Sequence, residues 1–404
     1  MLLMFNSFFI FAFIANTPRE IFDGLIRILN SPDVLISDYI VIGTMGSALV
    51  NSAVIGIASV LLMKFFKCEN TGTNIMSIWL MAGFAFFGKN LINCIPIVLG
   101  GFLYSLLHRK PFSEILGTTL LATSLAPAVS QMFFVVSSSW SGILLGLFLG
   151  IALGYIMIPV SRHIQAIHGG FNLYNAGFAG GIVSLLLTAA LRNAGFVLDT
   201  VSFWSENNNI FLALFLMFIC LAMLLMGVWL SGHGLHHLVE LYAYKEYDNI
   251  IYDAYTKHGE RAYMNMGMLG ACSTLMVLIL DGELSGPLVG GIFTIIGFGC
   301  LGKNLLNISP PIFGCMLAVF LNGWELNKPE YLLTMLFSAT LAPISSKFGK
   351  AWGIMAGFLH LNLTVKLAET HAGLSLYNNG FAGGFVVMVL VPLISSFYDI
   401  RKRH

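Results

Sequence analysis

Histidine, tyrosine and asparagine recur at the same spacing in two phrases of this chain. HGGFNLYNAGFAGG spans His168–Gly181, and HAGLSLYNNGFAGG spans His371–Gly384. A phenol, an amide and an imidazole can donate and accept hydrogen bonds, so each phrase could hold a small polar solute. We expect the tyrosines and asparagines to bind the solute and the histidines to act as gates or proton-sensitive groups. The candidates in this block are Tyr174, Asn175, Tyr377, Asn378, His168 and His371.

The glycines of these phrases predict an interrupted helix. Four of the five glycines in His168–Gly181 recur in the second copy, and each glycine disfavours a helix by about 1 kcal/mol relative to alanine. Irregular backbone at membrane depth is tolerated only against protein or a water-filled cavity. The alternative is that the glycines permit close helix packing, as small residues do in membrane bundles. Two matched copies favour the cavity.

A second repeated block, GKNLxNxxP, supplies one lysine to each half. Lys89 lies in GKNLINCIP and Lys303 in GKNLLNISP. A lysine at membrane depth normally pairs or faces a cavity, whereas one at the interface extends to the head groups; the sequence leaves both positions open. The asparagines would cap the next helix and could direct amides inward. This second candidate binding ring adds Lys89, Asn90, Asn93, Lys303, Asn304 and Asn307.

A third block carries hydroxyls ahead of a proline: EILGTTLLATSLAP at Glu114–Pro127 and EYLLTMLFSATLAP at Glu330–Pro343. Each proline removes a backbone donor and breaks or kinks its helix. The hydroxyls could line a pore or bond back to their own helix carbonyls. The pore-lining candidates are Thr118, Ser124, Thr334, Ser338 and Thr340.

The charged groups restrict the solute. No apolar run contains a matched Asp or Glu, so we expect a small neutral, amide-like solute, or a small anion if both lysines prove buried. His233, His236, His237 and Glu240 have a spacing compatible with a metal, but they lie in a polar stretch without a counterpart in the first half. We therefore expect no metal, no cofactor and no enzymatic activity.

The composition indicates which elements position these groups. With 57% hydrophobic and 10% charged residues and a mean hydropathy of +0.84, the chain is far more apolar than soluble domains, in which about 25% of residues are charged. Many uncharged windows reach the length that spans a bilayer. This predicts an all-α polytopic membrane protein, and a net charge of +1 argues against nucleic-acid binding. The apolar opening segment is expected to be a retained helix, and the six cysteines to be unpaired.

The three blocks recur in order, at offsets of 214, 216 and 203 residues. We therefore divide the chain into a first membrane repeat, 1–205, and a second, 206–404, with a polar inter-element loop at 232–261. We expect roughly 10–14 membrane segments, some broken or re-entrant, and an amphipathic stretch at Arg19–Leu29. The terminal RKRH favours a cytoplasmic C-terminus in a multi-pass inner-membrane protein.

At GKNLINCIP, GKNLLNISP and the doubled LYNxGFAGG, the chain resembles the tandem-repeat bacterial membrane proteins of a domain-of-unknown-function family, number 1576. That resemblance implies no activity. A more distant architectural likeness is to the urea transporters, carried by EIFDGLIRILNSPDVL and by the two LYNxGFAGG phrases. It implies a pore between two repeats, passive flow of an amide-like solute, and an oligomer.

These observations predict a transporter or channel that moves a small polar solute through a cavity between two homologous repeats. The expected partners are that solute, the lipid bilayer and, through the urea-transporter likeness, further copies of the chain. One alternative is a proton-coupled secondary transporter, with His168, His371 or a buried lysine carrying the proton. Another is a membrane-embedded enzyme or structural subunit, which would predict unequal polar groups in the two halves.

Overall fold

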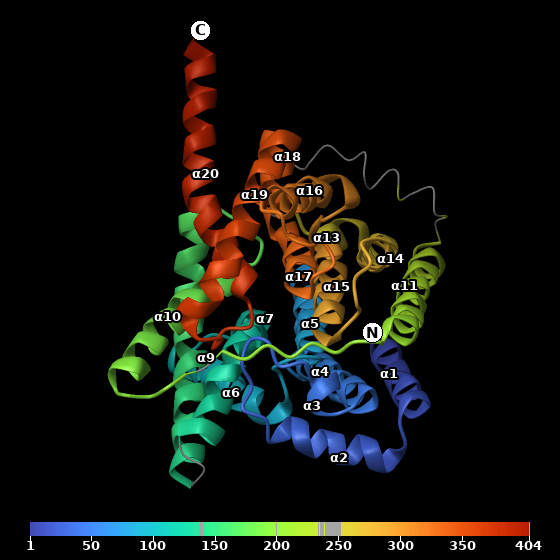
Figure 1. Cartoon of the computed structure of the whole chain (residues 1–404), viewed down its shortest axis with the longest axis vertical. Helices are drawn as coiled ribbons and strands as arrows, with labels where there is room; N and C mark the ends of the chain where they lie inside the picture. The colour runs from blue at the N-terminus through green and yellow to red at the C-terminus, as the bar shows by residue number, and fades with distance from the viewer. Residues whose placement is uncertain (137–139, 199, 233, 235–237, 239–251, 404) are drawn as a thin grey trace.

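The chain folds into a bundle of α-helices in the computed structural model shown in Figure 1. The structure describes all residues except 137–139, 199, 233, 235–237, 239–251 and 404. Within that described part there is no β-strand. The helices of the first half are α1 (Leu2–Ala15), α2 (Pro18–Leu29), α3 (Tyr39–Ile42), α4 (Met45–Phe65), α5 (Gly72–Phe84), α6 (Leu91–Leu107), α7 (Phe112–Ala122), α8 (Ala126–Gln131), α9 (Trp140–His168) and α10 (Asn175–Asn193).

The second half repeats this order of elements. Its helices are α11 (Asn209–Ser231), α13 (Ala254–His258), α14 (Ala262–Ile279), α15 (Gly286–Phe298), α16 (Leu305–Leu321), α17 (Pro329–Phe337), α18 (Ala342–Phe348), α19 (Lys350–Leu367) and α20 (Asn378–Arg403). By the offsets of the repeated blocks, α4–α10 correspond to α14–α20 one to one. The predicted repeat architecture is therefore present in the fold.

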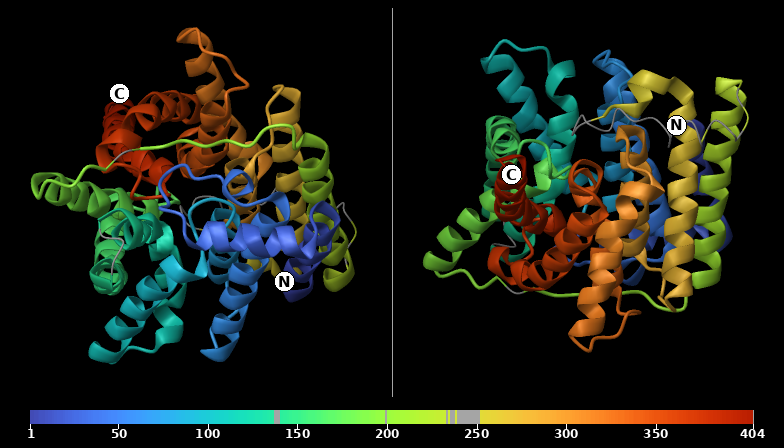
Figure 2. Two further views of the ribbon diagram at one scale, coloured as in Figure 1. Left: turned by 60° about the horizontal axis from the view of Figure 1, so that its bottom comes forward. Right: turned by 90° about the horizontal axis from the view of Figure 1, so that it is seen from above.

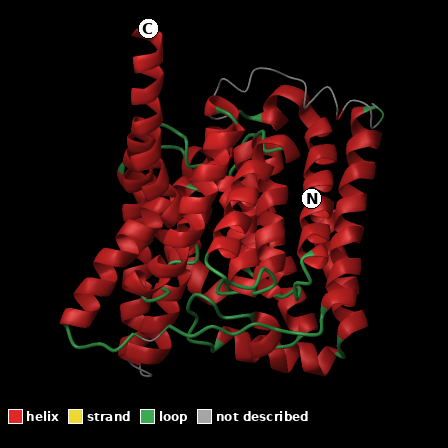
Figure 3. Cartoon of the chain, turned by 45° about the horizontal axis from the view of Figure 1, so that its top comes forward, coloured by secondary structure: helices red, strands yellow, loops and turns green. Residues whose placement is uncertain are grey.

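Seven helical stretches in the described residues are long and apolar enough to cross a membrane, and four shorter apolar helices accompany them. Long helices of this composition satisfy their own backbone groups, as hydrocarbon requires. The connecting loops lie mainly at the two ends of the bundle, with a few reaching its middle (Figure 3). The chain is a multi-pass helical membrane protein, as its composition predicts.

Local sequence explains where several helices begin. Thr17 and Glu20 form a capping box at α2, which is amphipathic, as predicted, with buried Ile21 and Ile28 and exposed charges. Thr44 caps α4 in the same way. Such side-chain acceptors satisfy backbone donors that have no partner in the first helical turn.

Equivalent helices of the two halves pack against each other in opposite directions. In α5 and α15, Gly83 lies against Gly290, while Gly297 lies against Met76. These contacts run in reverse order along the two helices, so α5 and α15 are antiparallel. An approximate two-fold axis perpendicular to them relates the halves, which makes the repeats inverted. Figure 1 labels α5 beside α15, and Figure 2 shows the blue helices of the first half and the yellow-to-orange helices of the second half from two further sides.

A second symmetric contact joins α10 and α20. A methyl group added to Gly177 would lie 2.8 Å from the Cα of Gly380, and one added to Gly380 would lie 2.8 Å from the Cα of Gly177. Gly181 and Gly384 receive the rings of Phe381 and Phe178 in the same reciprocal manner. The glycines of the repeated phrase therefore let two helices cross at backbone contact.

This arrangement corrects the predicted position of the helix break. Gly177, Gly180 and Gly181 lie inside α10 rather than interrupting a helix. The interruption precedes them, where Gly169 and Gly170 adopt φ of +58° and +84° between α9 and α10. Packing against α20 outweighs the low helix propensity of the three helical glycines.

The other predicted elements are found, with one qualification. The breaks at Pro127 and Pro343 are confirmed, because each proline is the second residue of a new helix, α8 or α18, that follows a 3₁₀ turn. The predicted polar loop 232–261, with His233, His236, His237 and Glu240, lies largely outside the described residues. Its described end forms α13, where Asp253 caps the helix.

Candidate functional site

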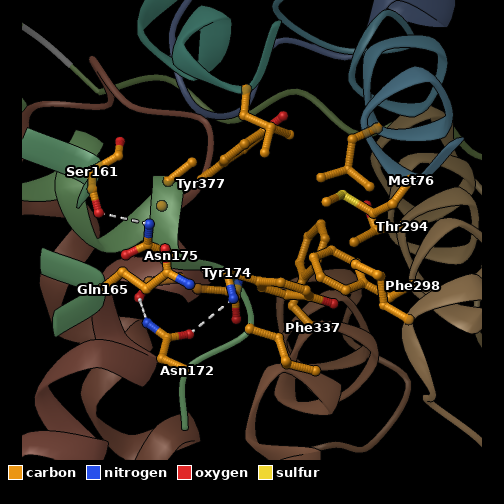
Figure 4. Close-up of a pocket in the computed structure, with 18 of the residues that line it drawn as sticks. Met76, Ser161, Gln165, Asn172, Tyr174, Asn175, Thr294, Phe298, Phe337 and Tyr377 are labelled. Carbon is orange, nitrogen blue, oxygen red and sulfur yellow. Dashed lines mark hydrogen bonds between the residues drawn. The ribbon is translucent and has the colours of Figure 1, made fainter. Parts of the chain in front are cut away.

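A cavity of about 170 Å³ lies between the two halves. Its lining includes equivalent residues from both: Tyr174 with Tyr377, Phe84 with Phe298, Leu173 with Leu376, and Gly177 with Gly380. This volume can hold several water molecules or a small organic solute. In Figure 4, Ser161, Gln165, Asn172 and Asn175 form a polar side, and Met76, Phe298 and Phe337 form an apolar side.

The cavity is not symmetric along its length. It extends to Thr73 and Gln165, which are exposed and mark a mouth at that end. The position equivalent to Thr73 is Pro287, which is buried. The α2–α3 loop contacts the repeated phrase His371–Gly384 of the second half. There the Leu35 N–H donates to the carbonyl of Gly373 at 3.0 Å. The lining residues that the second half contributes are all buried, so the cavity reaches the surface at the end marked by Thr73 and Gln165.

Each buried lysine contacts the tyrosine of the opposite half. Lys89 Nζ lies 2.8 Å from the Tyr377 hydroxyl, and Lys303 Nζ lies 2.8 Å from the Tyr174 hydroxyl. Both lysine side chains are at most 1% exposed. Lys89 Nζ is 5.3 Å from the ring centroid of Phe84, and Lys303 Nζ is 4.2 Å from that of Phe298. The snorkelling alternative is excluded for both lysines.

Histidine and asparagine pair within each phrase. His168 Nε2 lies 2.9 Å from Asn175 Oδ1, and His371 Nε2 lies 3.0 Å from Asn378 Oδ1. The amide nitrogens of Asn175 and Asn378 donate to the carbonyls of Ser161 and Thr364 in the preceding helices. Each pair therefore holds together the two helices on either side of the interruption. His168 and Asn175 also line the cavity, whereas His371 and Asn378 lie outside its lining.

The asparagines of the second block cap helices. Asn90 and Asn93 form a reciprocal capping box at α6, and Asn304 and Asn307 form one at α16. Asn93 and Asn307 also donate to the carbonyls of Gly88 and Gly302. None of the four lines the cavity. They fix the turns from which Lys89 and Lys303 project.

The predicted pore-lining hydroxyls occupy different places. Thr118 lines the cavity. Thr334 and Ser338 donate back to helix carbonyls, those of Glu330 and Met335. Thr340 and Ser124 lie outside the lining, on the two 3₁₀ turns, whose backbone carbonyls accept from Leu173 and Leu376 of the opposite half. These turns therefore hold the interrupted segments in place.

The two halves differ in one buried pair of polar residues close to the contact between α10 and α20. Thr340 Oγ1 donates to Asn172 Oδ1 at 2.6 Å and accepts from the Tyr174 N–H. The equivalent pair is Ser124 and Ser375, whose buried hydroxyls have no partner among the residues described. The cavity lining contains Asn172 but neither serine.

A further difference lies on α19 and α20. Asn379 lines the cavity and binds His360 through Oδ1 at 3.1 Å. The equivalent positions in the first half are Met157 and Ala176. Sequence comparison of the copies could have flagged Asn379, since it replaces Ala176 inside the repeated phrase.

Three sets of polar residues were missed by sequence reasoning. Asn51 donates to the carbonyls of Ala85 and Lys89, and Asn265 donates equivalently to those of Gly299 and Lys303. Their separation equals the 214-residue offset of the GKN block, so a systematic search at that offset would have found them.

Asp38 and Asp253 are a second missed set, two carboxylates that lie outside the apolar runs. Asp38 accepts from the Gly286 N–H at the start of α15, and Asp253 accepts from the Gly72 N–H at the start of α5. Each carboxylate thus caps a central helix of the opposite half. Both lie in loops rather than apolar runs, which is why inspection of the runs overlooked them.

Asp33 is the third missed group. It lies fully buried in the loop between α2 and α3, outside the candidate membrane spans. Its Oδ2 accepts from Asn90, Asn93 and Ser130, while Oδ1 has no partner within the described residues. Burial raises the pKa of Asp33 to about 7, although hydrogen bonds from Ser130, Tyr39 and Asn93 oppose the shift.

The fold and site define a class of protein: a multi-pass helical membrane protein whose two inverted halves enclose a cavity. More particularly, the chain belongs to a family of proteins of unknown function, DUF1576, which matches residues 17–193 and 234–396. The two matched regions fall in the two halves. No curated protein and no solved structure matches the chain, so the likeness to urea transporters stays a prediction.

Proposed function

We propose that this protein carries a small polar solute across a cell membrane through the cavity between its halves. The observation that carries the proposal is the cavity lining, in which both halves contribute equivalent tyrosine, phenylalanine and glycine positions around the two-fold axis. Inverted repeats that meet at a central site are the usual construction of membrane transporters.

The shape of the cavity supports a carrier rather than a permanently open pore. One end reaches exposed Thr73 and Gln165, whereas the lining residues of the second half are all buried. Since the halves are inverted copies, exchange of their local conformations would close the first end and open the second. The Lys–Tyr and His–Asn pairs occur in both halves. This supports transport over catalysis, because an enzyme would need catalytic groups in only one half.

The experiment is solute flux into liposomes containing the purified protein. Thr118→Trp places a large side chain in the cavity and should reduce uptake of a transported solute at least about tenfold while leaving folded protein. Leu186→Trp is the matched control, because Leu186 is 67% exposed on α10 and faces away from the cavity lining. Equal fluxes in both variants, or no flux of any small solute by the unaltered protein, would refute the proposal.

We further propose an inner-membrane location with the C-terminal side of α20 in the cytoplasm, because basic residues 401–403 follow its apolar part. Impermeant labelling of a cysteine placed after His404 in intact cells should fail and should succeed after lysis. An oligomer, if present, would be measured by native mass spectrometry of the same preparation.

A further inference from the structure

Within the described part of the chain, the two buried lysines have no carboxylate counter-ion of the kind that buried cations normally have. In the part of the chain that the structure describes, no carboxylate forms an ion pair with Lys89 or Lys303. The other contacts of Lys89 are the Met81 sulfur at 3.6 Å and the rings of Phe84 and Tyr377. Aromatic faces stabilise a cation only in part, so two ammonium groups here leave a large uncompensated desolvation penalty.

The titratable groups around each lysine are few. Lys89 faces the Tyr377 phenol from the loop before α20 and the Cys94 thiol from α6. Asp33 lies beyond Asn90 and Asn93 rather than against the ammonium. Lys303 faces the Tyr174 phenol from the loop before α10, and it lines a small pocket together with Tyr252 and Lys347. Among the residues that the structure describes, neither environment supplies a negative charge in direct contact with its lysine.

The cavity lies on the other side of the same two tyrosines. Tyr174 and Tyr377 both line it and both bind a lysine, so each phenol separates an amine from the solute space by one side chain. A phenol oxygen can accept from an ammonium while its O–H donates elsewhere. Of the described residues, no lysine or arginine lines the cavity directly.

A buried anion and a buried ammonium therefore stabilise each other at this site. Either charge alone is strongly disfavoured by burial. If an anion enters the cavity, protonation of the adjacent lysine becomes favourable, and protonation of the lysine raises anion affinity by the same factor.

We propose that the transported solute is a small carboxylate and that it binds together with one proton held on Lys89 or Lys303. This inference rests on the proposed transport function and specifies its substrate class and coupling. The proton enters with the carboxylate from the open side, resides on the lysine Nζ, and leaves with it on the other side. The step is electroneutral, and no other co-reactant is consumed.

The test uses glycolate and its neutral isostere glycolamide as probes in proteoliposomes with the membrane potential clamped at zero. With a one-unit acid-outside gradient, glycolate should accumulate up to about tenfold, because one pH unit corresponds to a tenfold proton ratio. Glycolamide should show no response to the gradient. Removal of the lysine that holds the proton, by Lys89→Met or by Lys303→Met, should abolish the pH-driven accumulation, whereas Lys64→Met, at an exposed position of α4, should retain it.

Tyr174→Phe and Tyr377→Phe give an independent reading, since each removes one hydroxyl and keeps the ring. Both should weaken glycolate uptake by at least about tenfold and leave monodisperse protein. Flux of glycolamide without flux of glycolate would overturn the carboxylate inference and leave transport itself intact. Glycolate flux indifferent to the gradient, or unchanged in both lysine variants, would also overturn it. Absence of flux for every small solute would reject the transport function as well.

Discussion

Gly177 of α10 and Gly380 of α20 lie backbone to backbone at equivalent positions of the two halves. A methyl group on either would approach the Cα of the other to 2.8 Å, and it would approach the carbonyl of Tyr377 or Tyr174 to 2.8 or 2.7 Å. This contact fixes the separation of the two tyrosine-bearing segments that line the cavity. The two halves can approach this closely only because both positions are glycine.

Gly177→Val and Gly380→Val should both destabilise the protein, because the contacting atoms are backbone and cannot rotate away. We expect a loss of about 1–3 kcal/mol or more for each, the range of overpacked cores. Thermal unfolding in detergent, followed by size-exclusion fluorescence, measures the change. Ala189→Val adds comparable volume at an exposed position of α10 and should shift the midpoint little. Stability equal to wild type in both glycine variants would contradict the crossing.

The Lys303–Tyr174 pair predicts an unequal response to removal of its two partners. Tyr174→Phe leaves the buried amine of Lys303 without its hydrogen bond and should lower stability by about 1–3 kcal/mol. Lys303→Met replaces the amine with an apolar chain of similar length and should be much closer to neutral. In the double variant, Tyr174→Phe should have little further effect. A double-mutant cycle of unfolding midpoints tests this, and additive losses would disprove the coupling.

Asn51 and Asn265 should contribute equally to the fold, since each amide nitrogen donates to two carbonyls of a lysine-bearing turn at 2.7–2.8 Å. Asn51→Ala and Asn265→Ala each leave buried carbonyls unpaired, and we expect losses of about 2 kcal/mol. Asn6→Ala, which removes only a local bond from an exposed side chain, is the control. If only one of the two buried variants lost stability, the two turns would not be equivalent.

Asp33 predicts a specific pH dependence of stability. Burial raises its pKa to about 7, above the value of about 4 expected in the unfolded chain. The folded state therefore binds a proton that the unfolded state releases, so this group lowers the unfolding free energy as pH rises from about 4 to 7. Above pH 7 the buried carboxylate is charged and its unfavourable contribution is complete.

Asp33→Asn keeps an acceptor for Asn90, Asn93 and Ser130 and removes the titration. Its unfolding midpoint relative to the natural protein should therefore be higher at pH 8 than at pH 5. Glu114→Gln, at an exposed carboxylate of α7, serves as the comparison and should show no such difference. A shift that was the same at both pH values would show that Asp33 does not titrate in this range.

Linear properties of the sequence were sufficient to predict the membrane class, the duplication and several boundaries. Hydropathy marks apolar helices, and prolines and capping residues act within a few positions, as at Pro127 and Thr17. The self-similar phrases also directed attention to Tyr174 and Tyr377 as lining residues. Their lysine partners could be named individually, because Lys89 and Lys303 stand in matched blocks.

Only the tertiary structure decided which groups meet. The antiparallel packing of α5 on α15 and the crossing of α10 over α20 bring Lys89 to Tyr377 and Lys303 to Tyr174, across more than 120 residues of chain in each case. The same packing turns Asn175 and Asn378 toward histidines of their own phrases and leaves the glycines helical. Which residues pair across the halves depends on the relative orientation of packed helices, and local sequence does not specify that orientation.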